Sequence, residues 1–294
     1  MLLPMMQSDR YQRAVNTVLR ILLWFFLLLG AVVTLFPFVW SILMSTHGRL
    51  TMFSTELTLQ MSDQLLTNYE RLLEVMPFWT AMFNSFLVAV PGTVVSLLFC
   101  SMGGYALAVY RFKARNLTFL LMVGIMMIPP VLTLIPYYLV VDTLGLMNTH
   151  LAVWLPVTIN PLGIFLMRQF TIAVVPKALL QAARLDGAGE FRTYWRVALP
   201  LLRPALGTLA IIQFVFLWNS FLQPLVVLTS QETQVVTLAL RSVQSLPNTP
   251  WGAVMLGTMI SMLPLIVIYL VASRQMIAAM TEARINRRTC ERFE

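Results

Sequence analysis

Six uncharged apolar runs constrain the fold of this chain more than any other feature of its sequence. They are Ile21–Met44, Phe78–Tyr110, Asn116–Val141, Leu151–Met167, Pro204–Ser230 and Ser242–Ser273. Each is long enough for a helix of about 17–25 residues, which is the length needed to cross roughly 30 Å of hydrocarbon. Pro156 and Pro161 interrupt the fourth run, which makes it the weakest candidate. The runs predict an all-α membrane protein with six transmembrane helices.

The composition agrees with a bilayer as the solvent. Apolar residues make up 59% of the 294 residues and charged residues 11%, whereas soluble domains have about 45–50% and about 25%. A chain this poor in charge cannot cover its surface in water. The formal net charge of +8 would also suit nucleic-acid binding, but the distribution of the basic residues argues against that partner.

The basic residues fall almost entirely on one side of the predicted membrane. With the N-terminus placed inside, three of the 20 Lys and Arg lie outside, namely Arg49, Arg71 and Arg241. The other seventeen lie in segments placed inside: Arg10, Arg13, Arg20, Arg111, Lys113, Arg115, Arg168, Lys177, Arg184, Arg192, Arg196, Arg203, Arg274, Arg284, Arg287, Arg288 and Arg292. This asymmetry follows the positive-inside rule. It predicts a multi-pass protein of the cytoplasmic (inner) membrane of a bacterium, with both termini in the cytoplasm. The first run is too long for the apolar region of a signal peptide, so no cleavage is expected.

Four regions are predicted along the chain. Residues 1–20 form a cytoplasmic tail, 21–79 the first transmembrane helix and an outer loop, 80–274 a core of five helices, and 275–294 a second cytoplasmic tail. Residues 68–75 of the outer loop have helical spacing and suit either the membrane surface or a solvated connector. Pro129, Pro130 and Pro136 predict a kinked or broken third helix, which either lines a cavity or is packed by protein.

A polar insert at 169–203 interrupts the core and has the pattern of a helix, a turn and a second helix. Pro176 suits the first position of a helix, and Ala178, Ala182 and Leu185 share one face. Gly187 stands where the end of a helix favours positive φ. Small side chains on this face allow close contact with a partner, and Arg184 and Asp186 at its rim would be able to pair with that partner.

The second helix of the insert is expected to be short. Phe191, Trp195 and Ala198 are predicted to form its apolar face, and Pro200 to end it. A simple connector between two spans has no need for two amphipathic helices about a fixed turn, so the insert is interpreted as a docking unit.

The insert resembles the EAA loop of ABC importer permeases. The residues that carry the resemblance are Gln181, Ala182, Ala183, Asp186, Gly187 and Ala188, followed by Pro200 and Pro204. Flanking segments are similar to carbohydrate-type permeases, in particular the second permease of maltose and glycerol-3-phosphate transporters: Asn84-Ser85, Tyr105–Ala108, Ile128–Pro130, Thr133, Ile135-Pro136, Leu144–Thr149, Trp218-Asn219 and Pro224-Leu225. The resemblance covers most of the chain. Two departures are Gln181, where the family usually has Glu, and a basic tail after residue 275 in place of a Gly-rich one.

The resemblance implies a type I ABC importer permease that moves a sugar or related solute by alternating access. The eight residues named above would belong to a coupling loop, 176–204, that docks on a separate ATPase. ATP and Mg would bind to that ATPase, and this chain would hold no cofactor or metal. The other implied partners are a second homologous permease, an ATPase dimer and an external solute-binding protein. The chain has no G-x-x-x-x-G-K-[ST] motif, as this division of labour requires.

Polar residues inside the predicted spans are candidates for a translocation path, because they are costly in a membrane. On an unbroken helix Gln213, Asn219, Ser220 and Gln223 fall within an arc of about 120°. Two interpretations stay open, a path for sugar hydroxyls or hydrogen bonds between helices. Tyr137 and Asn160 are further candidates. Trp218 points off this face and is expected to pack.

Two other functions fit less well. An ion-coupled secondary transporter usually has an acid or a His within a span, but all twelve acids and both His lie outside the six runs. An intramembrane enzyme needs a Ser–His pair, paired Asp or a metal cluster at membrane depth, and no run contains such a set.

Overall fold

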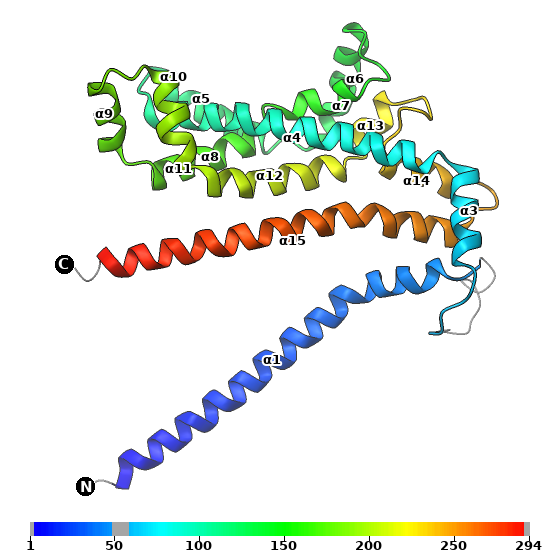
Figure 1. The fold of residues 1–294 in the computed structure, drawn as a ribbon, viewed down its shortest axis with the longest axis horizontal. Coiled ribbons are helices and arrows are strands. Elements are labelled where there is room, and N and C mark those ends of the chain that lie inside the picture. The colour runs from blue at the N-terminus through cyan, green and yellow to red at the C-terminus, as the bar shows by residue number, and fades with distance from the viewer. Residues whose placement is uncertain (1–2, 49–58, 291–294) are drawn as a thin grey trace. The chain divides into compact units, whose positions relative to one another are not determined.

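A computed structural model describes residues 3–48 and 59–290, with side chains over 16–48 and 59–270. Every regular element in these residues is helical (Figure 1). The chain forms two compact units, Met1–Leu72 with Pro250–Met259 and Leu73–Thr249 with Ile260–Glu294. Arg49 and Arg292 of the topology argument lie outside the described residues.

The first unit holds α1 (Leu3–Ser45), most of α3 (Leu65–Val75) and the beginning of α15 (Trp251–Cys290). Asn68 is buried in it, and its Nδ2 donates to the carbonyl oxygens of Ser45 at 2.8 Å and His47 at 3.0 Å. This amide satisfies carbonyl groups that the end of α1 leaves free. The helix predicted at 68–75 is confirmed as part of α3.

The second unit is built around one long helix, α4 (Phe78–Val109). The other elements that lie wholly within it are α5 (Arg115–Ile125), η1 (Pro130–Thr133), α6 (Leu134–Thr143), α7 (His150–Trp154), η2 (Leu155–Val157), α8 (Pro161–Val174), α9 (Lys177–Leu185), α10 (Glu190–Thr193), the π-helical η3 (Tyr194–Ala198), α11 (Leu199–Leu201), α12 (Arg203–Trp218), α13 (Leu222–Val227) and α14 (Val236–Gln244). Helices α8 and α12 pack along α4 (Figure 1). Small residues make these helix contacts close: a Cβ on Gly104 would lie 2.7 Å from the backbone nitrogen of Arg168, and one on Gly163 would lie 2.7 Å from the Sγ of Cys100.

The predicted number of spans is consistent with the helices. Three continuous helices are long and apolar enough to cross a membrane, Asn16–Ser45, Phe78–Val109 and Trp251–Leu270. Three pairs of helices, each bent at a short break, are also long and apolar enough to cross a membrane when the two helices of a pair are taken together. The pairs and the angles of their bends are Arg115–Ile125 with Pro130–Thr143 (100°), His150–Val157 with Pro161–Val174 (41°), and Glu190–Leu201 with Arg203–Trp218 (79°). Six spans result if each pair is one span. The break in the third predicted span, at Pro129-Pro130, is confirmed.

Two of the predicted spans differ from the structure. The fifth run is not one helix to Ser230, because α12 ends at Trp218 and α13 begins only at Leu222. The sixth span begins at Trp251, not at Ser242, which belongs to α14. Helix α14 lies between the fifth and sixth predicted spans, overlaps the start of the sixth, and was not expected. It buries an apolar face and its Val236 nitrogen donates to Ser85 Oγ at 2.9 Å, so packing against α4 fixes it.

Candidate functional site

Helix α9 presents one face to solvent and anchors the other. Ala178, Ala182 and Leu185 are exposed, and Leu185 is the extreme case at 89%. On the opposite side Leu180 is only 4% exposed and belongs to the apolar core. Pro176 is the residue before the helix and not its first residue, one position earlier than predicted. The predicted shared face therefore exists and points away from the protein.

The turn after α9 has a fixed geometry that depends on glycine. Gly187 has φ +78°, as its position predicted. Its nitrogen donates to the Arg184 carbonyl at 3.1 Å, and the Ala188 nitrogen donates to the Ala183 carbonyl at 3.0 Å. These two bonds form a Schellman motif, which closes the end of the helix. Asp186, the residue before the glycine, is exposed.

The second helix of the insert differs from the prediction in phase and length. Phe191 and Trp195 are exposed at 65% and 42%, while Thr193, Tyr194 and Ala198 are buried. Of the predicted apolar face, only Ala198 lies in the core. The π-helical turn at 194–198 accounts for this, since its wider turn rotates the face relative to a 3.6-residue period.

Neither Pro200 nor Pro204 ends a helix. Pro200 lies in the first turn of α11 and Pro204 in the first turn of α12. A first-turn residue needs no backbone donor, so proline is tolerated there. The prediction that Pro200 ends the second helix is wrong, because the chain instead turns by 79° at the boundary between Leu201 and Arg203.

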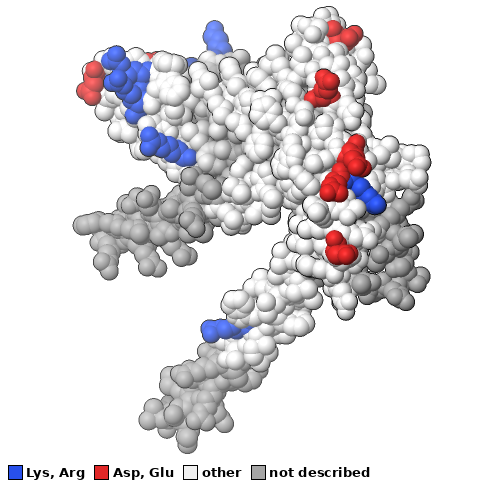
Figure 2. All heavy atoms as spheres, turned by 45° about the vertical axis from the view of Figure 1, so that its right-hand side comes forward, with Lys and Arg blue, Asp and Glu red and all other residues white. Residues whose placement is uncertain are grey.

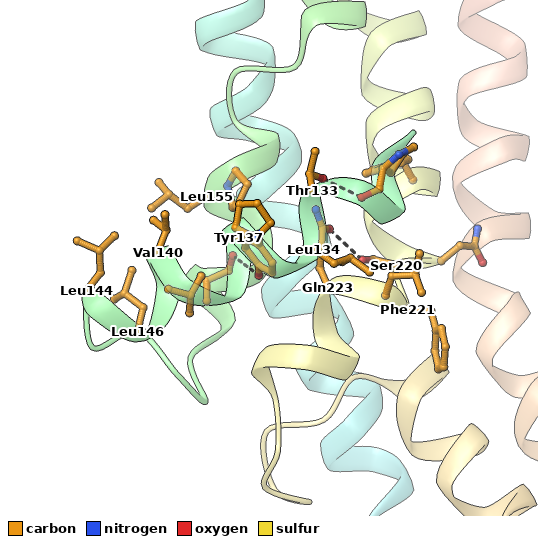
Figure 3. Close-up of a pocket in the computed structure, with 18 of the residues that line it drawn as sticks. Thr133, Leu134, Tyr137, Val140, Leu144, Leu146, Leu155, Ser220, Phe221 and Gln223 are labelled. Carbon is orange, nitrogen blue, oxygen red and sulfur yellow. Dashed lines mark hydrogen bonds between the residues drawn. The ribbon is translucent and has the colours of Figure 1, made fainter. Parts of the chain in front are cut away.

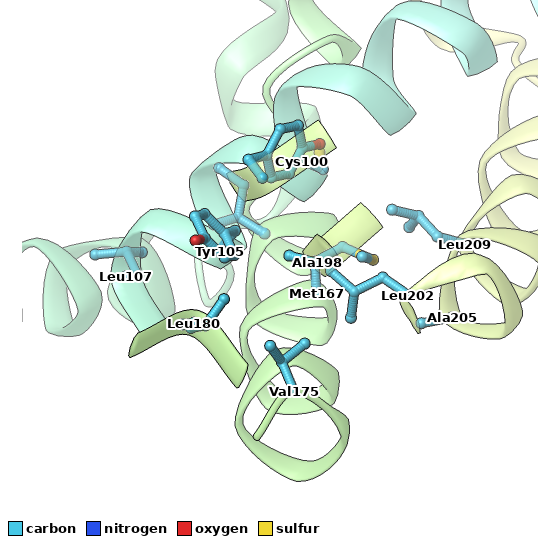
Figure 4. Packing of buried hydrophobic residues seen from close by; sticks show 12 residues of the cluster. Cys100, Tyr105, Leu107, Met167, Val175, Leu180, Ala198, Leu202, Ala205 and Leu209 are labelled. Carbon is cyan, nitrogen blue, oxygen red and sulfur yellow. The ribbon is translucent and has the colours of Figure 1, made fainter. Parts of the chain in front are cut away.

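A buried cluster ties the insert to the core helices. Figure 4 shows Tyr105, Leu180 and Met167 within it, together with Ala198 and Leu202 from the second half of the insert. Tyr194 is 3% exposed, its hydroxyl lies 2.6 Å from Ser101 Oγ, and its ring centroid lies 5.2 Å from that of Tyr105. The hydrogen bond satisfies a hydroxyl that burial would otherwise destabilise. This buried cluster, the base of α9, therefore supports the exposed face of the helix.

A polar link joins three elements at the rim of this base. Glu190 pairs with Arg184, with Oε1 at 2.9 Å from Nε, and its Oε2 accepts a hydrogen bond from the Tyr110 hydroxyl at 2.7 Å. The bond from Tyr110 lowers the pKa of the Glu190 carboxyl. Arg184, which was expected to pair with a docking partner, thus has a partner within this chain.

Glu190 and Tyr110 were not among the residues predicted from the sequence. Arg184 and Glu190 are six residues apart across the Gly187 turn, a spacing that brings no two side chains together on one helix. Tyr110 is distant in sequence and meets them only through the packing of α4 on the insert. No pattern in the sequence signals this link.

We expect Glu190→Gln to have a small effect on stability. The pair is half-exposed, and such pairs contribute about 0.2–1 kcal/mol. Because the folded pKa of Glu190 is lowered, the stabilisation is present at neutral pH and is lost as the pH falls through that pKa. Thermal unfolding of the purified wild type and variant should therefore differ slightly at pH 7 and converge in acid. A loss of several kcal/mol at pH 7 would contradict this assignment.

The second candidate feature is a cavity of about 950 Å³ in the same unit. It is lined by the second half of the broken third span, by α7 and η2, and by the residues that follow α12. In Figure 3, Leu144, Leu146 and Val140 lie on one side of it and Thr133, Ser220 and Gln223 on the other. Most of the lining is apolar, and its polar side chains lie toward one side, among Leu134 and Phe221.

Four of the six translocation candidates line this cavity: Tyr137, Asn219, Ser220 and Gln223. The Asn219 Nδ2 donates to the Val215 carbonyl at 2.9 Å, and the Tyr137 hydroxyl to the Ala152 carbonyl at 2.9 Å. Gln223 Oε1 accepts from Ser220 Oγ at 3.4 Å, while its amide nitrogen has no hydrogen bond among the described residues. The unbroken helix assumed for Gln213, Asn219, Ser220 and Gln223 is wrong, since the last three follow the end of α12.

The other two candidates bridge helices instead of lining the cavity. Asn160 caps α8 by accepting from the Leu162 nitrogen at 3.0 Å, and its Nδ2 donates to Gln213 Oε1 on α12 at 3.1 Å. Gln213 is fully buried, and its Nε2 has no hydrogen-bond partner among the described residues. Trp218 packs, as expected: it is 2% exposed and stacks on Phe214.

The part of the chain that the structure describes contains no group of three or more His, Cys, Asp or Glu able to hold a metal ion.

Comparisons with known proteins point to one family. The family described as "Binding-protein-dependent transport system inner membrane component" matches residues 100–281, which is more than half of the chain. A solved structure described as a bacterial ABC transporter involved in the import of the acidic polysaccharide alginate has a TM-score of 0.74 at 26% identity. The match covers 91% of this chain and 97% of that one.

Curated relatives match over most of this chain. The arabinooligosaccharides transport system permease protein AraQ of Bacillus subtilis is 33% identical over 90% of this chain and 95% of its own. That of Halalkalibacterium halodurans is 37% identical over 69% and 73%. The lactose transport system permease protein LacG of Rhizobium radiobacter is 30% identical over 86% and 91%. This chain thus belongs to the inner-membrane components of binding-protein-dependent transport systems, and it is a permease subunit of an ABC importer, not an enzyme.

Proposed function

We propose that this permease imports a saccharide as one of two related subunits that form a path across the membrane. A separate ATPase dimer docks on α9, and an external binding protein delivers the solute to the opposite side. Both termini lie in the cytoplasm. ATP and Mg bind to the ATPase, and this chain contributes no cofactor.

The exposed face of α9 is the observation that carries the docking proposal. Three apolar side chains, Ala178, Ala182 and Leu185, point away from the protein, and exposing Leu185 to water in this way is unfavourable without a partner. The exposed rings of Phe191 and Trp195 extend the apolar area. The buried base beneath α9 would pass a push from the ATPase to α4 and α8.

The cavity, mostly apolar with a few polar side chains, supports a saccharide as the solute. Sugar rings have apolar faces and a rim of hydroxyls, so they suit a site with both kinds of surface. The amide of Gln223 and the hydroxyl of Ser220 offer hydrogen bonds, and Phe221 and Tyr137 offer ring surfaces (Figure 3). Similarity to permeases for arabinooligosaccharides and lactose supports the same class.

Alternating access gives the broken helices a role. Breaks at Pro129-Pro130 and at residues 219–221 leave backbone groups near the cavity that intact helices would hide, as is tolerated where a helix lines a cavity. Rocking of the two permease subunits would open this cavity to one side and then to the other.

Reconstituted transport tests this function. The permease would be placed in proteoliposomes with its ATPase, second permease and binding protein, and ATP-driven uptake of labelled arabinooligosaccharide, lactose and glycerol phosphate compared. We expect uptake of a saccharide. Uptake of glycerol phosphate alone would contradict the proposed solute class.

The variant Gln223→Ala is expected to reduce saccharide uptake roughly fivefold to tenfold, since it removes a hydrogen bond worth about 1 kcal/mol or more. ATPase binding should be unchanged. Gln231→Ala is the matched control, because Gln231 is exposed and does not line the cavity. If both variants lost uptake equally, or neither lost any, the cavity would not be part of the translocation path.

A further inference from the structure

A second cavity of about 990 Å³ lies in the same unit and differs in character from the first. It is bordered by the ends of α4 and α8, the beginning of α5 and one side of α9. Four basic residues line it, Arg111, Arg115, Lys177 and Arg184, and no acidic residue does. Figure 2 shows Lys and Arg atoms at the end of this unit that carries α9 and α10.

Most of this positive charge is not neutralised within the chain. Among the described residues the single ion pair is Arg184 with Glu190. Arg115 donates only to carbonyl groups at the end of α4, the closer being that of Leu107 at 2.8 Å. Arg111 and Lys177 have no described partner. Three cations around one cavity repel each other unless an anion lies between them.

The walls of the cavity are apolar beneath these charges. Val109, Ile172 and Val174 line it at the ends of two helices that cross the membrane. Val175 and Leu180 belong both to its lining and to the apolar core of Figure 4. Cations above an apolar wall, at the level where spans end, match an anionic headgroup joined to acyl chains.

We infer that this cavity binds the phosphate group of an anionic phospholipid, such as phosphatidylglycerol. Arg111, Arg115 and Lys177 hold the phosphate, and the apolar wall contacts the glycerol and upper acyl region. Under the proposed orientation the lipid belongs to the cytoplasmic leaflet. The inference does not depend on which solute is transported.

Two neighbouring stripes of α9 carry this site and the docking surface. Lys177, Gln181 and Arg184 follow one another at i, i+4 and i+7 and line the cavity. Ala178, Ala182 and Leu185 each follow one residue later, so their stripe lies about 100° further round the helix. Lipid in the cavity would therefore contact one side of α9 while the ATPase contacts the adjacent side. Gln181, neutral where a carboxylate would repel phosphate, suits this arrangement.

Native mass spectrometry of the purified full chain tests the site. The probe is phosphatidylglycerol, compared with phosphatidylcholine and with inorganic phosphate. We expect retention of phosphatidylglycerol over phosphatidylcholine, and the double variant R111Q/K177Q should weaken it roughly 10- to 30-fold, at about fivefold for each cation removed. Gln181→Glu should weaken it as well, by adding a negative charge.

Two controls keep the result specific. R192Q/R196Q removes the same charge from the insert outside the cavity and should keep the lipid, and Lys177→Arg should keep it too. Folding of each variant is checked by its elution on size exclusion. If millimolar phosphate displaced the lipid, the site would be one for free phosphate, and the proposal of a bound lipid would be wrong. The proposed lipid site would also be wrong if R192Q/R196Q lost as much lipid as R111Q/K177Q. It would be wrong too if the assembled transporter retained no lipid, because the ATPase would then cover the cavity.

Discussion

The variant Gly104→Val is expected to lose most of its folded protein. A Cβ at residue 104 would lie 2.6 Å from the Cβ of Met167 and 2.7 Å from the backbone nitrogen of Arg168. Both atoms belong to the facing helix α8, and a backbone atom cannot rotate aside as a side chain does. Overpacking costs about 1–3 kcal/mol where neighbours can adjust, and here α8 itself would have to move. Since total stability is only about 5–15 kcal/mol, thermal inactivation of the detergent-solubilised protein should shift downward by many degrees.

The preceding residue supplies a matched control. A Cβ on Gly103 meets only the side chain of Ile164, at 3.4 Å or more, which is an ordinary contact. Gly103→Ala should therefore be neutral or stabilise by up to about 1 kcal/mol, since alanine replaces glycine within a helix. If the two variants were equally unstable, close packing of α4 on α8 would not be the reason, and the glycines would matter for some other property of α4.

Sequence patterns predicted the spans well because the bilayer imposes a length on them. The runs at Phe78–Tyr110 and Ile21–Met44 agree closely with α4 and with the end of α1. Proline chemistry predicted the break near Pro129, and a glycine after α9 predicted the positive φ at Gly187. In each case the cause is local, since a missing donor or a backbone conformation acts where the residue stands.

Features set by tertiary contact were not predictable from the same patterns. The π-helical turn at 194–198 places Tyr194 in the core, where its hydroxyl hydrogen-bonds Ser101 and its ring contacts that of Tyr105. Trp195 stays exposed. A 3.6-residue period cannot anticipate that rotation. Helix α14 is short and half polar, and packing on α4 selects it.

The polar residues of the fifth run show how residues grouped on a helical wheel can come together through a different geometry. Asn219, Ser220 and Gln223 do lie together at the cavity, but only because α12 ends and the chain bends back at α13. Gln213, placed on the same face by the helical wheel, is buried and accepts a hydrogen bond from Asn160. The helical wheel assumed one unbroken helix, whereas these residues meet at the cavity because the helix is broken after Trp218.

The variant Gly187→Glu is expected to uncouple ATP hydrolysis from transport. Gly187 has φ +78°, a conformation that costs other residues about 1–2 kcal/mol. A Cβ at this residue would meet no atom within 4 Å, so the whole cost is conformational. Helix α9 has nine residues and is too short to be stable alone, so loss of its Schellman motif should fray the docking face. An equilibrium shift of roughly fivefold to thirtyfold follows, and saccharide taken up per ATP hydrolysed should fall by a similar factor.

Two further variants distinguish the turn from the added charge at the ATPase contact. Gly189 has φ −64° and open space around it, so Gly189→Glu brings the same charge two residues away without the conformational cost. It should transport nearly as wild type does. Gly187→Asn should be milder than Gly187→Glu, since asparagine tolerates positive φ. If Gly189→Glu lost coupling as fully as Gly187→Glu, the charge would be responsible. If Gly187→Glu coupled normally, α9 would not be the docking element. The ATPase would then have to act on a surface whose structure does not depend on this turn.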